Sequence, residues 1–199
     1  MSVVFNPNAH FENVSAFDPH PCKSTIQVWR FPVNSKGKML KPSLALAICH
    51  TWGHATTLKF RPHPEPLSPL DLGFLCGVFG DGKTRILRVH LPSDESPNAD
   101  YCHFDLYTSA AYTLTLPVPI TVAQWHTSNS IVVGTTSGAI AIFHLTDPDP
   151  KPSLYHPLHQ TYITALTTCF PSFPNYIVTS SMDGHSRLTS LLAPTVDSP

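Results

Sequence analysis

The chain has 199 residues, and its 12 basic and 13 acidic side chains leave a formal net charge of −1. This length is sufficient for a sizeable core, and the balanced charge argues against a nucleic-acid-binding domain that is basic throughout and against a polybasic membrane-binding patch. The 21 prolines are about twice the usual share, and because proline interrupts helices, a helical bundle is excluded as well.

The first predicted element is a strand at residues 23–31, and the most basic segment of the chain follows it. Residues 30–41 read RFPVNSKGKMLK, and we expect an exposed loop there. The charge of such a loop is usually only solvated, but clustered cations also bind phosphates or acidic partners. The candidates for a phosphate or partner contact are Arg30, Lys36, Lys38 and Lys41.

From residue 57 onward, the same order of elements is predicted three times. Each group has a short apolar strand, a longer apolar strand, and a turn ending in glycine that leads into an alternating strand. Because glycine supplies the positive φ of tight hairpin turns, each turn predicts a β-hairpin. The predicted strands are residues 57–60, 73–79 and 81–89, then 120–125, 130–136 and 137–145, and finally 163–166, 176–181 and 183–191.

These hairpins belong to a repeat. Four segments beginning at residues 23, 81, 137 and 183 align without gaps, at intervals of 46 to 58 residues. Repeated groups of antiparallel strands are typical of β-propeller blades, and WD40-type blades take about 40 to 45 residues before insertions. We therefore predict an all-β fold, a WD40-like β-propeller that is incomplete, with about four blades. It forms one domain over residues 1–199, with repeats near 1–31, 44–91, 101–145 and 156–192.

The blade anchors are degenerate. An ordinary WD40 blade is held by a Gly-His pair, a turn Asp, a strand Ser or Thr, and a strand Trp. Here Gly53-His54 and Asp81 share a repeat that has Leu87 at the Trp position. The predicted structural anchors are Trp29, Trp52, Gly53, His54, Asp81, Gly82, Trp125, Gly138, Asp183 and Gly184.

The second repeat has the most distinctive sequence. Residues 52–62 read WGHATTLKFRP, and after a proline-rich insert residues 72–89 read LGFLCGVFGDGKTRILRV. This pattern resembles the WD40-repeat subunits of the RNA polymerase III general transcription factor IIIC (TFIIIC), in particular the fungal subunit in its B-box-binding half. The specific resemblance spans residues 22–89, and beyond residue 120 the match is to propeller blades in general.

The resemblance implies a nuclear scaffold subunit with no catalytic residues, cofactor, metal or small-molecule substrate. Its partners would be other subunits of the complex, including another WD40 propeller, and DNA would be engaged only indirectly through the assembly. No membrane contact is implied. The chain is too short for the complete ring of this family, so we expect a fragment or a half-ring that something else completes.

Two other functions remain open. One is a generic WD40 adaptor of another intracellular complex, which would use the same surfaces. The other is a nucleotide-binding enzyme, because residues 77–84 (GVFGDGKT) fit a P-loop in which Lys83 would contact phosphates and Thr84 would contact Mg²⁺. A P-loop opens a helix, whereas residues 85–91 alternate like a strand, which disfavours this alternative.

The cysteines and histidines form no recognisable metal-binding pattern. The five cysteines are isolated, with no C-x-x-C motif, and are predicted to be reduced core residues. The histidine pairs with the closest spacing fall in strands or loops rather than on one helix face, and they are His50 with His54 and His156 with His159.

Overall fold

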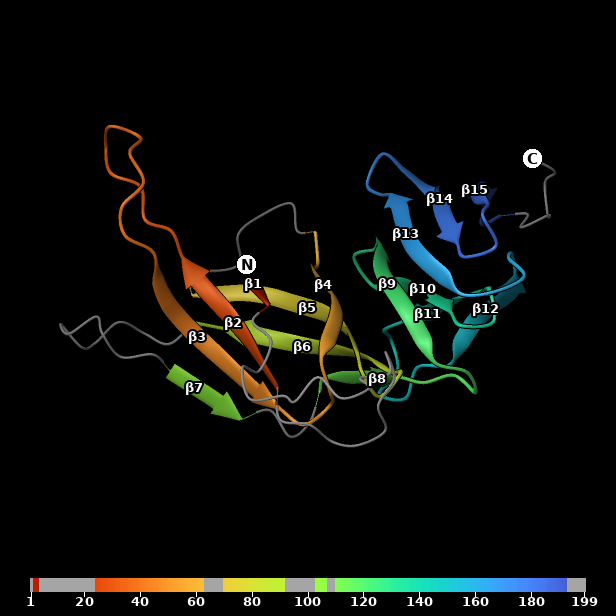
Figure 1. The fold of residues 1–199 in the computed structure, drawn as a ribbon, viewed down its shortest axis with the longest axis horizontal. Coiled ribbons are helices and arrows are strands. Elements are labelled where there is room, and N and C mark those ends of the chain that lie inside the picture. The colour runs from red at the N-terminus through yellow and green to blue at the C-terminus, as the bar shows by residue number, and fades with distance from the viewer. Residues whose placement is uncertain (1, 4–23, 63–69, 92–102, 107–109, 193–199) are drawn as a thin grey trace.

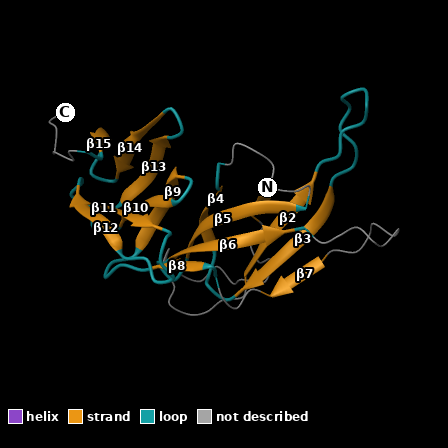
Figure 2. Cartoon of the chain, turned by 180° about the vertical axis from the view of Figure 1, so that it is seen from behind, coloured by secondary structure: helices purple, strands orange, loops and turns teal. Residues whose placement is uncertain are grey.

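The computed structural model describes residues 2–3, 24–62, 70–91, 103–106 and 110–192. Every regular element in these ranges is a β-strand, and the strands form four sheets that follow one another along the chain (Figures 1 and 2). Within the same ranges, no helix is long and apolar enough to cross a membrane. The all-β prediction is confirmed.

The first sheet contains strands from two distant parts of the chain. Its order is β1-β2-β3-β7, and the last pair is parallel, with Leu46 opposite His103 and Cys49 opposite Leu106. Strand β7 comes from the segment between two strands of the second sheet, so it covers the outer edge of β3 and ties the two sheets together. The strands are β1 (Ser2–Val3), β2 (Ser24–Arg30), β3 (Ser43–His50) and β7 (His103–Leu106).

The other three sheets are antiparallel, with their strands in chain order. The second contains β4 (Ala55–Phe60), β5 (Asp71–Phe79), β6 (Thr84–His90) and β8 (Tyr112–Leu114). The third contains β9 (Ile120–Thr127), β10 (Ser130–Thr135), β11 (Ala139–His144) and β12 (Pro152–Pro157). The fourth has three described strands, β13 (Ile163–Cys169), β14 (Phe173–Ser181) and β15 (Ser186–Ser190).

The three predicted hairpins are present as β5–β6, β10–β11 and β14–β15. Their turns contain Gly82, Gly138 and Gly184, each with a positive φ between 75° and 84°. The repeats and the sheets are offset by one strand. Residue 44 begins a predicted repeat, yet β3 pairs with β2, so that repeat combines the third strand of one sheet with the first three strands of the next.

The core lies between neighbouring sheets. Because successive side chains of a strand point to opposite faces, β5 places Leu75 in the cluster shared with the first sheet and Cys76 in the cluster shared with the third. A further cluster joins the third and fourth sheets through Val132 and Ile177. The sheets therefore pack face to face as blades do, in an open array rather than a closed ring (Figure 1).

Candidate functional site

A buried hydrogen-bond network anchors the turn of the fourth sheet. His159 Nδ1 lies 3.0 Å from Asp183 Oδ2, and His159 Nε2 lies 2.8 Å from Thr179 Oγ1. The backbone N–H groups of Gln160 and His185 donate to the same carboxylate at 3.1 and 2.9 Å. The network thus fixes the β14–β15 turn to the segment that precedes β13.

The environment of Asp183 favours its charged form. Burial disfavours the carboxylate, but the hydrogen bonds from the backbone N–H groups of His185 and Gln160 and from His159 outweigh that effect. Together they hold the pKa of Asp183 below its ordinary value. Asp183 is therefore ionised at neutral pH and acts as a fixed acceptor within the fold.

The corresponding turn of the second sheet is anchored differently. Asp81 accepts two hydrogen bonds from Arg85, at 2.9 Å from Nη1 and 2.5 Å from Nη2. The guanidinium lies 4.6 Å above the Trp52 ring and 5.6 Å from the Phe79 ring, which is a cation–π arrangement. The bidentate contact and the stacking hold the Arg85 side chain at the end of the second sheet, beside the β5–β6 turn.

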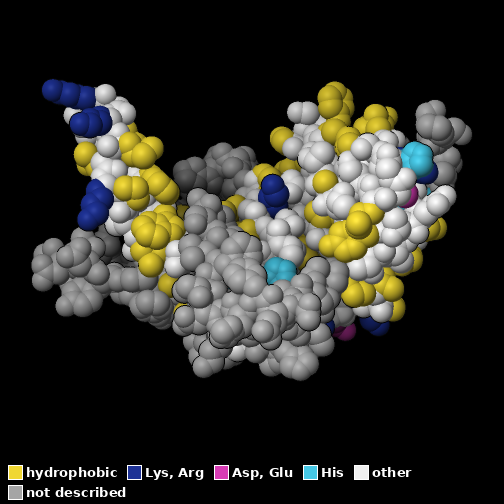
Figure 3. All heavy atoms as spheres, viewed as in Figure 1, with side chains coloured by type: hydrophobic (Ala, Val, Ile, Leu, Met, Phe, Trp, Pro, Cys, Tyr) yellow, Lys and Arg dark blue, Asp and Glu magenta, His cyan; other side chains and the backbone are white. Residues whose placement is uncertain are grey.

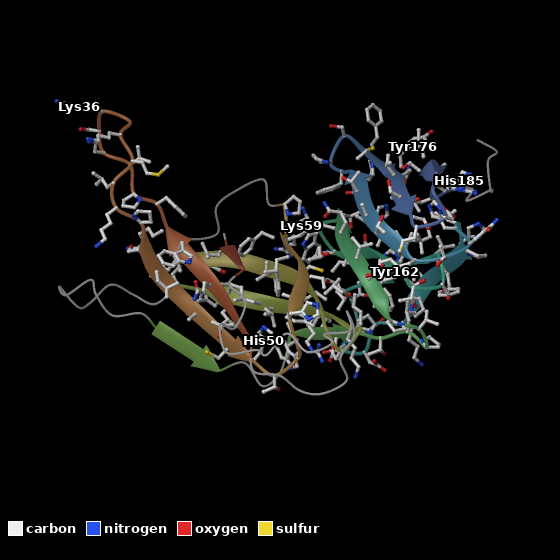
Figure 4. All side chains as sticks on the ribbon, in the orientation of Figure 1. Lys36, His50, Lys59, Tyr162, Tyr176 and His185 are labelled. Atoms are coloured by element: carbon white, nitrogen blue, oxygen red, sulfur yellow. The ribbon has the colours of Figure 1, made fainter. Side chains whose placement is uncertain are left out.

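His50, the last residue of β3, belongs to the same aromatic cluster; its position is labelled in Figure 4. Its ring stacks on Trp52 at 5.1 Å and meets Phe79 edge-on at 5.0 Å. Burial, and secondly the charge of Arg85, lower the pKa of His50 to about 4, although Asp81 acts in the opposite direction. His50 is therefore neutral at pH 7.

Five predicted anchors come together at this end of the second sheet. Asp81 N–H donates to the Trp52 carbonyl at 3.3 Å, and a Cβ on Gly53 would lie 3.0 Å from Gly80 Cα. His54 packs against Gly80 as well, but in the described part of the chain it makes no hydrogen bond to Asp81. Gly82 donates to Phe79 O, and its carbonyl accepts from Ile120 N–H at 2.9 Å.

Trp125 and Gly138 lie at the seams between sheets. The buried Trp125 indole donates to the Lys59 carbonyl at 3.0 Å, and the Trp125 carbonyl accepts from Thr168 Oγ1 at 2.8 Å, so this residue joins three sheets. The Gly138 carbonyl accepts from the backbone N–H of His159 at 2.9 Å. A Cβ at Gly138 would overlap the His159 carbonyl, so this seam requires glycine.

Trp29 and Gly184 are the remaining predicted anchors. Trp29 is half-buried, and its indole donates to Gln27 Oε1 of the same strand at 3.0 Å. Gly184 lies in the β14–β15 turn beside Asp183, and its N–H donates to the Ser181 carbonyl at 3.2 Å. It has a positive φ, and a Cβ added there would meet open space.

Sequence reasoning missed several residues that carry these anchors. In the sequence, His159 stands out only as half of a histidine pair, although a histidine that precedes a strand, a hairpin and a turn Asp is a detectable signal. Arg85 was visible in the D-G-x-x-R motif but was not assigned a role. The other missed groups are His50, Phe79, Thr121, Thr168 and Thr179, and Thr121 Oγ1 donates to the Ile163 carbonyl at 2.6 Å.

The four candidate cationic contacts lie on one arm. The connection between β2 and β3 extends well beyond the sheet, with Lys36 at its far end (Figures 1 and 4). Arg30, Lys36, Lys38 and Lys41 are all exposed. The structure thus brings these cations together, and we call residues 30–41 the basic hairpin.

The P-loop alternative does not fit the structure. The turn at Gly82 leads into β6, which begins at Thr84 and pairs antiparallel with β5. No helix begins at Lys83 or Thr84, so the phosphate cradle of a P-loop is not formed. Thr84 is buried within the sheet, away from solvent.

The cysteines and histidines of the described ranges bring no three potential metal ligands together. Cys76 is buried as predicted, and burial raises the pKa of its thiol. Cys49 and Cys169 are only half-buried, so the expectation of core cysteines is wrong for these two. Cys22 and Cys102 lie outside the described residues.

Comparison with known proteins gives two similar curated sequences, and no family model matches the chain. The transcription factor tau subunit sfc6 of Schizosaccharomyces pombe is 25% identical over 88% of this chain. The transcription factor tau 91 kDa subunit of Saccharomyces cerevisiae is 28% identical over 87% of it. The chain spans only 29% and 24% of the lengths of these relatives.

Solved structures with a similar fold include WD40 domains. The WD40 domain of Toxoplasma gondii coronin aligns with a TM-score of 0.53 and 16% identity, over 75% of this chain and 34% of that one. The C-terminal WD40 domain of Sif2 aligns with a TM-score of 0.52 and 12% identity, over 75% and 35%. The predicted incomplete WD40-like β-propeller is confirmed, as is the resemblance to WD40-repeat subunits of TFIIIC.

Proposed function

We propose that this chain is a non-catalytic interaction scaffold of a TFIIIC-like complex that acts in RNA polymerase III transcription in the nucleus. The observation that carries the proposal is the similarity to two transcription factor tau subunits over 88% and 87% of the chain. The partners would be other subunits, including a second WD40 propeller. DNA would be contacted indirectly, through the assembled complex.

The placement of the polar groups supports a scaffold role. Two groups whose pKa values are strongly lowered, His50 and Asp183, lie in anchors that hold turns and sheets in place. Arg85 and Asp81 satisfy each other in the same way. Groups with shifted pKa values often mark catalytic sites, but hydrogen-bonded pairs that only stabilise the fold shift pKa values as well. The contacts of His50 and Asp183 are of this stabilising kind.

Affinity purification of the tagged protein from nuclear extract tests the proposal. At a physiological ionic strength of about 0.15 M, we expect the other subunits of a TFIIIC-like complex to be recovered in near-stoichiometric amounts. The matched control is the same purification with an unrelated tagged WD40 protein. Recovery with a different assembly would contradict the proposal and favour a generic WD40 adaptor.

A further inference from the structure

The basic hairpin is an ordered arm that is held by its own hydrogen bonds. Val33 pairs with Met39, and the Leu40 N–H donates to the Pro32 carbonyl at 2.8 Å. At the tip, Asn34 Oδ1 accepts from the backbone N–H groups of Lys36 and Lys38 at 3.0 and 2.9 Å. These bonds hold the backbone of the arm in a hairpin.

The arm exposes several large apolar side chains within one short segment. Four of the ten exposed large hydrophobic side chains in the described residues lie on it, so this surface is concentrated rather than scattered. They are between 48% and 61% exposed, and they are Phe31, Val33, Met39 and Leu40. Concentrated exposed apolar surface marks an interaction site.

The charge of the arm has one sign. Arg30, Lys36, Lys38 and Lys41 are basic, and the sequence contains no acidic residue between Asp18 and Glu65. Figure 3 shows the basic side chains gathered on the arm beside hydrophobic ones. A surface of this kind is complementary to a ligand that has both negative charge and apolar groups.

We propose that the basic hairpin docks a segment of a partner protein in which acidic and apolar side chains alternate. This inference rests on the scaffold function proposed above and names the chemistry of one partner. Duplex DNA would neutralise the cations through its phosphates, but its backbone would leave Val33 and Met39 in water. An acidic and apolar protein segment satisfies both halves of the surface at once.

Fluorescence anisotropy with defined probes tests the inference on the full chain. The probes are a labelled peptide in which Glu and Leu alternate, a matched peptide with Ser in place of Leu, and a short DNA duplex. We expect the Glu-Leu peptide to bind at least about tenfold more tightly than the Glu-Ser peptide and than the duplex at an ionic strength of about 0.15 M.

Three variants locate the binding. Val33→Ser combined with Met39→Ser should remove the preference for the Glu-Leu peptide, and Lys36→Glu combined with Lys38→Glu should weaken both peptides by about tenfold or more. The matched control is Leu188→Ser combined with Lys151→Glu, at exposed positions outside the hairpin, which should change nothing. All six positions are exposed, so thermal unfolding should be unaffected.

Three results would overturn the inference. Tighter binding of the duplex than of the Glu-Leu peptide, insensitive to the serine variant, would identify a phosphate site. Equal binding of the peptides, or equal losses in the hairpin and control variants, would show non-specific attraction. Failure of the proposed scaffold function would be seen separately. In that case the affinity purification would recover no other subunits, while the chain would still bind the Glu-Leu peptide more tightly than the Glu-Ser peptide.

Discussion

The hairpins of the second and fourth sheets contain the same motif, D-G-x-x-R, and use it in opposite ways. In the second sheet, Asp81 pairs with Arg85 of its own hairpin. In the fourth sheet, Asp183 pairs instead with His159, and Nη1 of Arg187 is buried without a hydrogen-bond partner among the described residues. The motif fixes the turn, but the segment that packs beside it decides which partner the aspartate takes.

The two pairs also differ in burial. The side chain of Asp183 is 6% exposed and that of His159 is fully buried, whereas Asp81 is 26% exposed. A buried donor or acceptor that loses its partner is costly because water cannot replace it. Breaking the fourth-sheet pair should therefore destabilise the chain more than breaking the second-sheet pair.

Replacing the histidine of the fourth sheet should have the largest effect. His159→Ala removes two hydrogen bonds and leaves a buried carboxylate without its imidazole partner, so we expect a loss of about 3 kcal/mol in the free energy of unfolding. Thr179→Val, which removes only one of the two hydrogen bonds, should cost about 1 kcal/mol. Urea unfolding measures both. A smaller loss in His159→Ala than in Arg85→Met would contradict the comparison.

The second-largest difference is expected between alanine substitutions at the two turn glycines. Gly82 and Gly184 both have a positive φ, but a Cβ at Gly82 would lie 2.9 Å from Pro119 Cβ, while a Cβ at Gly184 would meet open space. We expect Gly184→Ala to cost about 1 kcal/mol for its backbone conformation alone, and Gly82→Ala to cost about 2–3 kcal/mol. Equal costs in urea unfolding would show that the contact with Pro119 has no effect.

Acid should weaken the second-sheet cluster before the fourth-sheet network. The pKa of His50 is lowered to about 4 in the folded chain, so between pH 6.5 and 4 the unfolded state binds the proton and the folded state does not. Stability should therefore fall by about 1–2 kcal/mol from pH 7 to pH 5. Over the same range Asp183 stays ionised, because its pKa is also lowered.

The variant His50→Phe isolates this effect, since it keeps an aromatic ring beside Trp52 and removes the titrating group. Urea midpoints measured from pH 7 to pH 5 should fall less steeply in this variant. The remaining slope would come from groups such as His126, whose pKa is lowered mainly by burial. An unchanged slope would show that folding does not lower the pKa of His50.

The smallest expected effect belongs to the Arg85 guanidinium. Arg85→Lys keeps the charge but loses the bidentate contact with Asp81 and the flat stacking on Trp52. We expect a loss of about 1 kcal/mol, because Asp81 remains partly solvated. A loss as large as that of His159→Ala in the same unfolding assay would remove the distinction between the two anchors.

The sequence predicted the elements well because their signals are local. Alternating apolar residues and a glycine at the turn position were sufficient to place the hairpin that contains Gly82. The pairing of β7 with β3 could not be predicted, because the paired residues are more than fifty positions apart in the sequence and no hairpin turn joins the two strands directly. The choice of His159 as the partner of Asp183 depends on packing in the same way.

In the basic hairpin, too, one part could be predicted from the sequence and another could not. Its charges were visible in the sequence, and Lys36 and Lys38 were correctly placed in an exposed connection. Its exposed apolar surface was not predicted. The pairing of Val33 with Met39 shows that residues 30–41 form a hairpin, and only the structure shows that Met39 is exposed there. Composition alone does not distinguish an exposed methionine from a core methionine.

Depletion of the protein from cells, followed by gradient sedimentation of the remaining subunits of the TFIIIC-like complex, tests the central claim most directly. A scaffold holds other subunits together, so its removal should convert one large species into separate smaller ones. Re-expression of the protein should restore the large species. If the complex sediments unchanged without the protein, the chain is not a scaffold of that assembly.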